Sequence, residues 1–375
     1  MEWQKNSKER NNHMSTKILI NGNFLCRSLT GIERFAYEIC RQLDILLENK
    51  KNEVKFEISI LVPQNAKVFP EYKNINSIIS EKPLTSFPRW DMFYFAKMCK
   101  KHSSTGLNFS NTAPLGKKCG YAFLHDIYAH DFPQDFSSKK DRLIRAYSCF
   151  HYKNIAKKAK RIFTVSEFSK NQIQKAYNIE ESRICVIPNG WDHFKSIEED
   201  EEIFQKFPVL TQKPFFFTLG SLQKRKNLKW ISEYAKNHPE QTFAISGKTI
   251  GGMKSTEIGD LSALKNVVLL GYVSDGEVKA LMKKCRAFIF PSYYEGFGIP
   301  PLEALSVGAQ IIVAKSASLP EIYKKCAHYI AWDSTNCDLN DILNEQVEDS
   351  ADVLSEYTYE NSAKKLFEVL NGGSK

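Results

Sequence analysis

At residues 290–305 the chain reads FPSYYEGFGIPPLEAL, which predicts a strand, a glycine-bearing turn and a helix in that order. The apolar run that ends at Phe290 suits a buried parallel strand. Gly296 and Gly298 leave the backbone of the turn without Cβ atoms, so that a ligand can approach it closely. Pro300 suits the first turn of a helix, and Gly308 suits its C-terminal end. We therefore expect a short helix whose first amide groups are free to meet a ligand.

Two glutamates carry the chemistry of this stretch. Glu295 lies at the mouth of the turn, and Glu303 lies on the helix behind it. A helix N-terminus favours an anion such as a phosphate, but both carboxylates would repel a phosphate on its own. The glutamates suit the hydroxyl groups of a sugar or a ribose beside that phosphate. A surface turn with two solvated glutamates is the alternative interpretation.

Apolar runs of strand length alternate with helical spacing along the whole chain. This alternation predicts mostly parallel sheets with helices on both faces, hence an α/β fold with two doubly wound halves. The pattern restarts after an acidic run at residues 198–202. We assign this run to the linker side of the boundary between the two halves. The predicted strands are residues 17–22, 56–62, 107–111, 121–124, 161–165, 184–187, 215–219, 243–246, 267–270, 287–290 and 311–314.

Candidate ligand groups follow strands in both halves. His125 and Asp126 come at the end of a strand, where ligands gather in α/β sheets; a structural histidine is an equally good interpretation. Arg225 and Lys226 lie in a basic loop before a helix. Cations there are unfavourable unless an anion binds, so we expect a phosphate site, with a solvated turn as the alternative. The turn at Gly31 lacks the G-x-G-x-x-G fingerprint, which counts against a nicotinamide-dependent dehydrogenase.

The composition indicates a globular protein with a sizeable core. Apolar residues make up 42% of the 375 residues, which is ordinary for such a protein. The sequence has no uninterrupted apolar run near the ~20 residues of a membrane span, and residues 1–13 lack the apolar centre of a signal peptide. Nine cysteines without a C-x-x-C pair indicate reduced thiols rather than disulfides or structural zinc. We expect a cytoplasmic protein.

A formal net charge of +9 favours anionic partners. No nucleic-acid motif accompanies the charge, so we expect no nucleic-acid partner. Residues 86–101 combine aromatic and basic side chains; they predict a core helix with solvated lysines, with an amphipathic membrane-surface helix as the alternative. We also expect residues 90–101 and 151–161 to attract an anionic membrane surface, which would place the protein peripherally on the inner face of the plasma membrane.

The pattern around Glu295 and Glu303 resembles the E-x7-E signature of retaining family-4 glycosyltransferases of the GT-B fold. The resemblance is greatest to mannosyl- and related hexosyltransferases of bacterial surface-polysaccharide assembly, such as lipopolysaccharide or capsule. Similar landmarks occur at residues 30–34, 125–126, 165–169, 187–190, 220–227, 271–273 and 359–363.

What the resemblance implies is a GT-B fold, in which two Rossmann-like domains face each other across a cleft. The acceptor domain would be residues 15–195 and the donor domain residues 213–355, with a linker at residues 196–212. Residues 1–14 would form a loose tail, and residues 356–375 a terminal helix that crosses back to the first domain. The implied reaction is a retaining, metal-independent transfer of a hexosyl unit from a nucleoside-diphosphate sugar to a saccharide or lipid-linked saccharide, with no cofactor.

The resemblance also assigns roles to residues. Arg225 and Lys226 would bind the donor diphosphate, and Glu303 would bind the ribose hydroxyls. The catalytic group would comprise Glu295, which addresses the transferred sugar, with Lys226, His125 and Asp126. Further donor-binding positions would be Gly31, Ser221, Gly271, Tyr272, Gly296, Phe297, Gly298 and Ile299.

Two positions depart from the family pattern. Ser221 stands where many relatives have arginine, so Arg225 must supply that charge; Tyr359 stands where a tryptophan is common. GDP-mannose is the donor that we favour, ahead of a UDP- or dTDP-sugar. The alternatives are a sugar-nucleotide 2-epimerase of the same fold and a non-catalytic nucleotide-sugar binding subunit.

Overall fold

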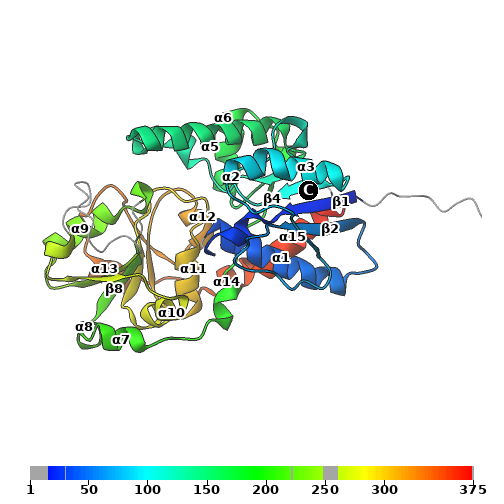
Figure 1. Cartoon of the computed structure of the whole chain (residues 1–375). Coiled ribbons are helices and arrows are strands. Elements are labelled where there is room, and N and C mark those ends of the chain that lie inside the picture. Colours follow the sequence, from blue (N-terminus) through cyan, green and yellow to red (C-terminus); the bar gives the residue numbers. More distant parts are fainter. Residues whose placement is uncertain (1–15, 30, 221–222, 248–260, 374–375) are drawn as a thin grey trace, which may run out of the picture.

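A computed structural model describes residues 16–29, 31–220, 223–247 and 261–373 of the chain. It confirms the predicted fold class, because the chain forms two domains that are each built on a parallel sheet with helices packed against it (Figure 1). The positions of residues 1–14 and of Ser221 lie outside the described residues.

The N-terminal domain contains a seven-stranded sheet in the order β3-β2-β1-β4-β5-β6-β7. Its strand order reverses between β1 and β4, which is the kind of switch point where doubly wound folds bind ligands. The strands are β1 (Thr16–Asn21), β2 (Phe56–Val62), β3 (Asn76–Ile79), β4 (Thr105–Asn108), β5 (Tyr121–Phe123), β6 (Arg161–Thr164) and β7 (Ile184–Val186). The main helices are α1 (Ile32–Asn49), α2 (Phe87–Arg89), α3 (Phe95–Lys101), α4 (Tyr128–Asp131), α5 (Lys139–Lys158) and α6 (Glu167–Tyr177).

The C-terminal domain contains a six-stranded sheet in the order β10-β9-β8-β11-β12-β13. This is the 3-2-1-4-5-6 order of a dinucleotide-binding fold, and its switch point lies between β8 and β11. The strands are β8 (Phe215–Leu219), β9 (Thr242–Ser246), β10 (Val267–Gly271), β11 (Ala287–Phe290), β12 (Ile311–Ala314) and β13 (His328–Ile330). The helices are α9 (Leu228–Asn237), α10 (Asp275–Lys284), α11 (Ile299–Ser306), α12 (Leu319–Tyr323), α13 (Leu339–Asn344) and α14 (Ala351–Glu356).

The last helix, α15 (Tyr359–Leu370), lies beside α1 in the N-terminal domain (Figure 1). Phe367 packs against Phe56, with ring centroids 5.7 Å apart. Asn371 accepts a hydrogen bond from the backbone N–H of Lys55 and donates one to the carbonyl of Glu53. The end of the chain is therefore anchored on the first domain after the second has been completed.

Residues 86–101 form the core segment that we favoured from the sequence. A five-residue π-helical turn, Trp90–Tyr94, separates α2 from α3. Trp90 and Phe95 are buried in the core, whereas Phe93 is 63% exposed. The segment packs through most of its aromatic side chains and exposes one of them.

Two strands and two linker helices were not predicted. β3 is a mostly exposed edge strand and β13 has three residues, so neither has the apolar run that marks a buried strand. The region of residues 196–212 contains α7 (Glu202–Lys206) and α8 (Val209–Gln212), each about one turn long. The strand predicted at residues 107–111 is β4, which begins two residues earlier, at Thr105, and ends at Asn108.

Candidate functional site

A cavity of about 320 Å³ lies between the two domains, at the carboxyl ends of β8 and β11. This is the switch point of the C-terminal sheet, where the geometry of a parallel sheet favours a ligand. Its lining from the N-terminal domain is Leu29, Gly31, Ile32, Arg34, His125, Asp126, Val165 and Asn189. From the C-terminal domain come Arg225, Lys226, Asp275, Glu295, Gly296, Phe297, Gly298, Ile299, Pro300 and Glu303.

The two glycines of the turn, Gly296 and Gly298, let neighbouring atoms pack directly against the backbone. A Cβ atom at Gly296 would lie 2.4 Å from the carbonyl oxygen of His125 in the other domain. Gly298 has φ of +92°, and a Cβ atom there would lie 2.7 Å from the side chain of Leu319. Gly298 is also the N-cap of α11 and, as a glycine, has no side chain that could cap the helix. Pro300 and Pro301, in the first turn of α11, have no backbone N–H, so the helix start offers fewer amides than we expected. The candidate amide donors for an anion are those of Phe297, Gly298 and Ile299, which line the cavity.

Glu295, Arg225 and Lys226 form a buried ion-pair triad. One carboxylate oxygen of Glu295 lies 2.6 Å from Nη1 of Arg225, and the other lies 2.7 Å from Nζ of Lys226. Burial would raise the pKa of Glu295, but the two cations outweigh it and hold that pKa below its ordinary value. Burial lowers the pKa of Lys226, against the opposing effect of Glu295. The residues that we assigned to the diphosphate and to the sugar therefore contact each other directly.

Glu303 contacts a histidine that the sequence did not single out. Its Oε1 lies 3.0 Å from Nε2 of His193, a buried residue in the segment that follows β7. Tyr359, at the start of α15, packs against the His193 ring with centroids 5.6 Å apart. This contact holds Glu303 in place, and no motif in the sequence marks His193 as its partner.

Arg34 and Asp275 connect the domains at the edge of the cavity. Nη2 of Arg34, on α1, lies 2.5 Å from Oδ2 of Asp275 at the start of α10. Both residues line the cavity, and both were missed from the sequence, because their pairing depends on how the domains face each other.

His125 and Asp126 both line the cavity. Nε2 of His125 donates to the carbonyl oxygen of Phe109 at 2.7 Å, which leaves Nδ1 as the acceptor of the ring. Burial lowers the pKa of His125, so the ring is neutral at physiological pH. Oδ1 of Asp126 accepts from the backbone N–H of Tyr128 at 3.0 Å. The pair lies at the site, and each residue also has a local structural contact.

Gly271 and Tyr272 are not among the residues that line this cavity. Gly271 is the last residue of β10 and has φ of +68°, and Tyr272, which follows it, is 68% exposed. Within residues 16–29, 31–220, 223–247 and 261–373, no cluster of histidine, cysteine, aspartate and glutamate side chains could hold a metal ion.

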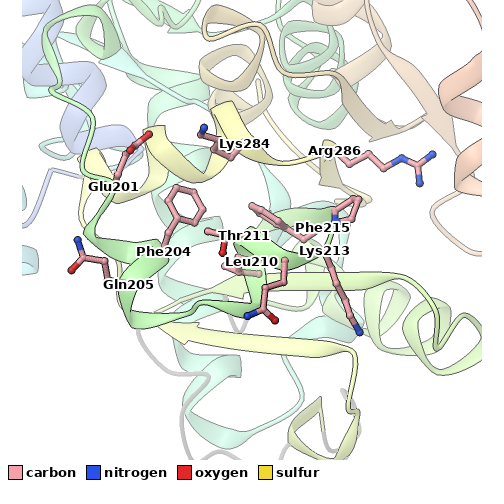
Figure 2. Close-up of a pocket in the computed structure, with 11 residues that line it drawn as sticks. Glu201, Phe204, Gln205, Leu210, Thr211, Lys213, Phe215, Lys284 and Arg286 are labelled. Atoms are coloured by element: carbon pink, nitrogen blue, oxygen red, sulfur yellow. The ribbon is translucent and has the colours of Figure 1, made fainter.

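A larger cavity of about 880 Å³ lies elsewhere in the C-terminal domain (Figure 2). Phe204, Leu210 and Phe215 provide apolar surface, and Lys213, Lys284 and Arg286 are among its polar lining residues. It lies at the amino end of β8, the opposite end of the sheet from the switch point. None of the residues assigned from the sequence lines it, so its size alone does not make it the candidate site.

Two family models match the chain and together cover most of it. The model "Glycosyltransferase Family 4" matches residues 29–193, and the model "Glycosyl transferases group 1" matches residues 199–364. Residues 194–198 separate the two matches.

Among curated proteins, the chain is similar to two O-antigen mannosyltransferases. It is 28% identical to the O-antigen chain mannosyltransferase RfbU of Salmonella typhimurium, over 62% of this chain and 63% of that protein. It is 29% identical to the O-antigen chain mannosyltransferase B of Escherichia coli, over 53% of each chain. The matches thus span between half and two thirds of each relative's length.

The fold is similar to that of a solved glycosyltransferase, WaaG, which is involved in lipopolysaccharide biosynthesis. The TM-score is 0.62 at 17% sequence identity, and the superposition covers 95% of this chain and 100% of WaaG. No helix among the described residues is both long and apolar enough to cross a membrane.

Proposed function

Because the chain belongs to the glycosyltransferases, with a family 4 domain followed by a group 1 domain, we propose that it transfers a hexosyl unit from a nucleoside-diphosphate sugar to a saccharide or lipid-linked saccharide acceptor. The observation that carries this proposal is the convergence of Arg225, Lys226, the glycine-bearing turn before α11 and two glutamates in one interdomain cavity. Cations and amides suit a diphosphate, and carboxylates suit sugar hydroxyls.

The proposed mechanism relies on charge stabilisation and requires neither a metal nor a cofactor. When the nucleoside diphosphate leaves, negative charge grows on its phosphate, and the fixed cations and the backbone amides of the turn at residues 297–299 stabilise that charge. Asp126 and the neutral ring of His125 would face the reacting centre from the other domain. On the ground of family membership, we also propose that the anomeric configuration is retained. The acceptor would attack from the front face, and its proton would pass to the donor phosphate.

For the donor we propose GDP-mannose ahead of a UDP- or dTDP-sugar, and the support is the similarity to two mannosyltransferases. The test is a thermal-shift panel of GDP-, UDP- and dTDP-sugars, with NAD as the control ligand. We expect at least one nucleotide sugar to raise Tm, GDP-mannose most of all, and NAD to leave it unchanged. Stabilisation by NAD together with no response to any nucleotide sugar would show that the proposed donor class is wrong.

We further propose that the N-terminal domain associates with an anionic membrane surface on the cytoplasmic side. On α5, Leu143, Ile144 and Phe150 are 71%, 47% and 50% exposed. Exposed basic residues flank them, and Phe93 adds a further exposed aromatic side chain. The exposed basic residues in this region are Arg89, Lys97, Lys100, Lys101, Lys139, Lys140, Arg142, Lys153, Lys157, Lys158 and Lys160. Trp90 and His151, which lie in the segments that we assigned to the membrane from the sequence, are buried and cannot contribute.

Liposome flotation tests this membrane proposal. Each basic residue near anionic lipid contributes about 1 kcal/mol, and salt screens the attraction. We expect binding to anionic vesicles that weakens in high salt and in a Leu143→Ser/Ile144→Ser variant. The control is Ile45→Ser on α1, where Ile45 is 45% exposed; it should bind like wild type. Equal binding to neutral vesicles, or no binding to either, would contradict the proposal.

A further inference from the structure

Glu295 lies on the two cations that the proposed function assigns to the donor diphosphate. We propose that Glu295 is an internal competitor of that diphosphate: its carboxylate leaves Arg225 and Lys226 when the donor binds and returns to them to promote release of the nucleoside diphosphate. The inference rests on the proposed function and adds a second role for Glu295 to its contact with the transferred sugar.

The geometry gives each cation its own carboxylate oxygen. The distances are 2.6 Å to Arg225 and 2.7 Å to Lys226, and the Glu295 side chain is only 7% exposed. Nη1 of Arg225 also donates to the carbonyl oxygen of Tyr294 at 3.2 Å. Because the carboxylate and a phosphate would compete for the same buried N–H groups, the cations cannot bind both at full strength.

The charges of the triad also indicate that Glu295 competes with the diphosphate. Two cations and one carboxylate leave a net charge of one positive unit, whereas a diphosphate brings at least two negative units. A diphosphate on Arg225 and Lys226 would place its charge against the Glu295 carboxylate, and like charges repel strongly in a buried site. If the carboxylate turns toward the sugar, it stabilises the positive charge that develops there when the leaving group departs.

The surrounding contacts restrict this movement to the side chain. Oγ of Ser318 donates to the carbonyl oxygen of Glu295 at 3.0 Å, and Oγ of Ser166 donates to that of Gly296 at 2.6 Å. The backbone is therefore fixed on both sides of the peptide, while the cavity that Glu295 lines offers space for a different rotamer. After transfer the sugar is attached to the acceptor, and the carboxylate regains the cations as its best partners.

A permanent structural ion pair makes the opposite prediction. If Glu295 only held Arg225 and Lys226 in position, then removing its charge would disorder them and weaken the binding of a diphosphate. If Glu295 competes, then removing its charge strengthens that binding. Inorganic pyrophosphate is the suitable probe, because it has neither a ribose nor a base to contact Glu303.

The experiment is isothermal titration of pyrophosphate into wild type, Glu295→Gln and the matched control Glu303→Gln, which removes one charge from the same cavity. We expect Glu295→Gln to bind pyrophosphate at least about tenfold more tightly, as the coupling of close charge pairs predicts, and Glu303→Gln to bind it like wild type. Equal or weaker binding by Glu295→Gln would overturn the inference, and so would an equal gain in Glu303→Gln.

A second variant covers the case in which two unpaired buried cations prevent Glu295→Gln from folding. Glu295→Asp keeps the charge but withdraws the carboxylate from the cations, and it should also bind pyrophosphate more tightly than wild type. Nucleotide sugars that stabilise wild type while no variant gains affinity for pyrophosphate would overturn this inference alone. The absence of binding of pyrophosphate and of every nucleotide sugar would overturn the proposed function as well.

Discussion

At the scale of single residues, the candidate site shows why a motif predicts which residues matter better than it predicts what they contact. The spacing of Glu295 and Glu303 places both in one cavity. Their partners Arg225, Lys226 and His193 come from segments far along the chain. Arg225 and Lys226 could be found from the sequence because cations before a helix need an anion. His193 could not be found in this way, because the sequence around it does not distinguish it from a histidine of the hydrophobic core.

Lys226 and Glu303 should affect different kinetic constants. In the proposed mechanism Lys226 acts on the leaving diphosphate, whose charge grows in the transition state, whereas Glu303 holds the ribose equally throughout. Lys226→Ala should lower kcat on the order of 100- to 1000-fold, the scale for one charge-stabilising group. Glu303→Ala should mainly raise KM for the donor, because lost buried hydrogen bonds would weaken the free energy of donor binding by about 1 to 3 kcal/mol.

Steady-state kinetics with varied donor concentration separates these effects. Glu295→Gln should fall between the two, because it contacts the sugar on which positive charge develops. A Lys226→Ala variant with near-normal kcat would mean that the basic loop does not contact the diphosphate. In that case the loop would be a solvated turn, and the diphosphate site proposed at Arg225 and Lys226 would be wrong.

At the scale of elements, most strands follow from runs of apolar residues, but contacts between elements depend on the whole fold. β2 has the predicted bounds, and α15 lies within the predicted residues 356–375, because their apolar patterns are strong. β3, β13 and the short linker helices were missed, because short or exposed elements leave little periodicity to detect. On α5, the sequence shows basic residues throughout, and only the structure separates the buried His151 from the exposed Phe150.

The burial of His151 predicts that the protein loses stability at acidic pH. Burial lowers the pKa of His151 to about 4, against an ordinary value of about 6.5. Its Nδ1 accepts from the backbone N–H of Ala113, and protonation would remove that acceptor. The unfolded chain therefore binds more protons between these two values, so stability is present above about pH 6.5 and is lost as the pH falls toward 4.

Thermal melting at pH 7 and pH 5 checks this prediction. We expect Tm of wild type to fall by a few degrees or more, and the fall to be smaller in His151→Gln, which keeps an acceptor but does not titrate. His125 and His328, whose pKa values burial also lowers, should account for part of the remaining fall. An identical fall in wild type and variant would show that His151 does not limit stability at low pH.

At the scale of the whole molecule, the two domains are joined by specific polar contacts around the cavity. Tyr293 and Tyr294 of the C-terminal domain donate to Asp135 and Asp131 at 2.6 and 2.8 Å. Both carboxylate oxygens of Glu321 accept from the first amides of α6 in the N-terminal domain, at 2.8 Å each. The side chains that complete the site thus come from surfaces that meet only when both domains have folded.

This arrangement explains how far the sequence could predict the molecule. Two parallel sheets follow from the order of strands and helices, and the GT-B resemblance follows from the motif at residues 290–305. The contact of Gly296 with the carbonyl of His125, and that of Arg34 with Asp275, depend on the relative placement of the domains. Local patterns do not encode that placement, so the roles of the individual site residues stay predictions until they are tested.

The central claim is that the cavity transfers a sugar from a nucleotide to an acceptor. The most direct test measures release of nucleoside diphosphate from the stabilising nucleotide sugar, with and without a lipid extract that contains lipid-linked saccharides. We predict that the rate of release rises at least about tenfold when the extract is added. The reason is that the transition state of a transfer reaction includes the acceptor, so the interactions that stabilise it form only when the acceptor is bound. Release at the same rate without an acceptor would indicate an epimerase, and binding without any release would indicate a non-catalytic subunit; either result would contradict the claim.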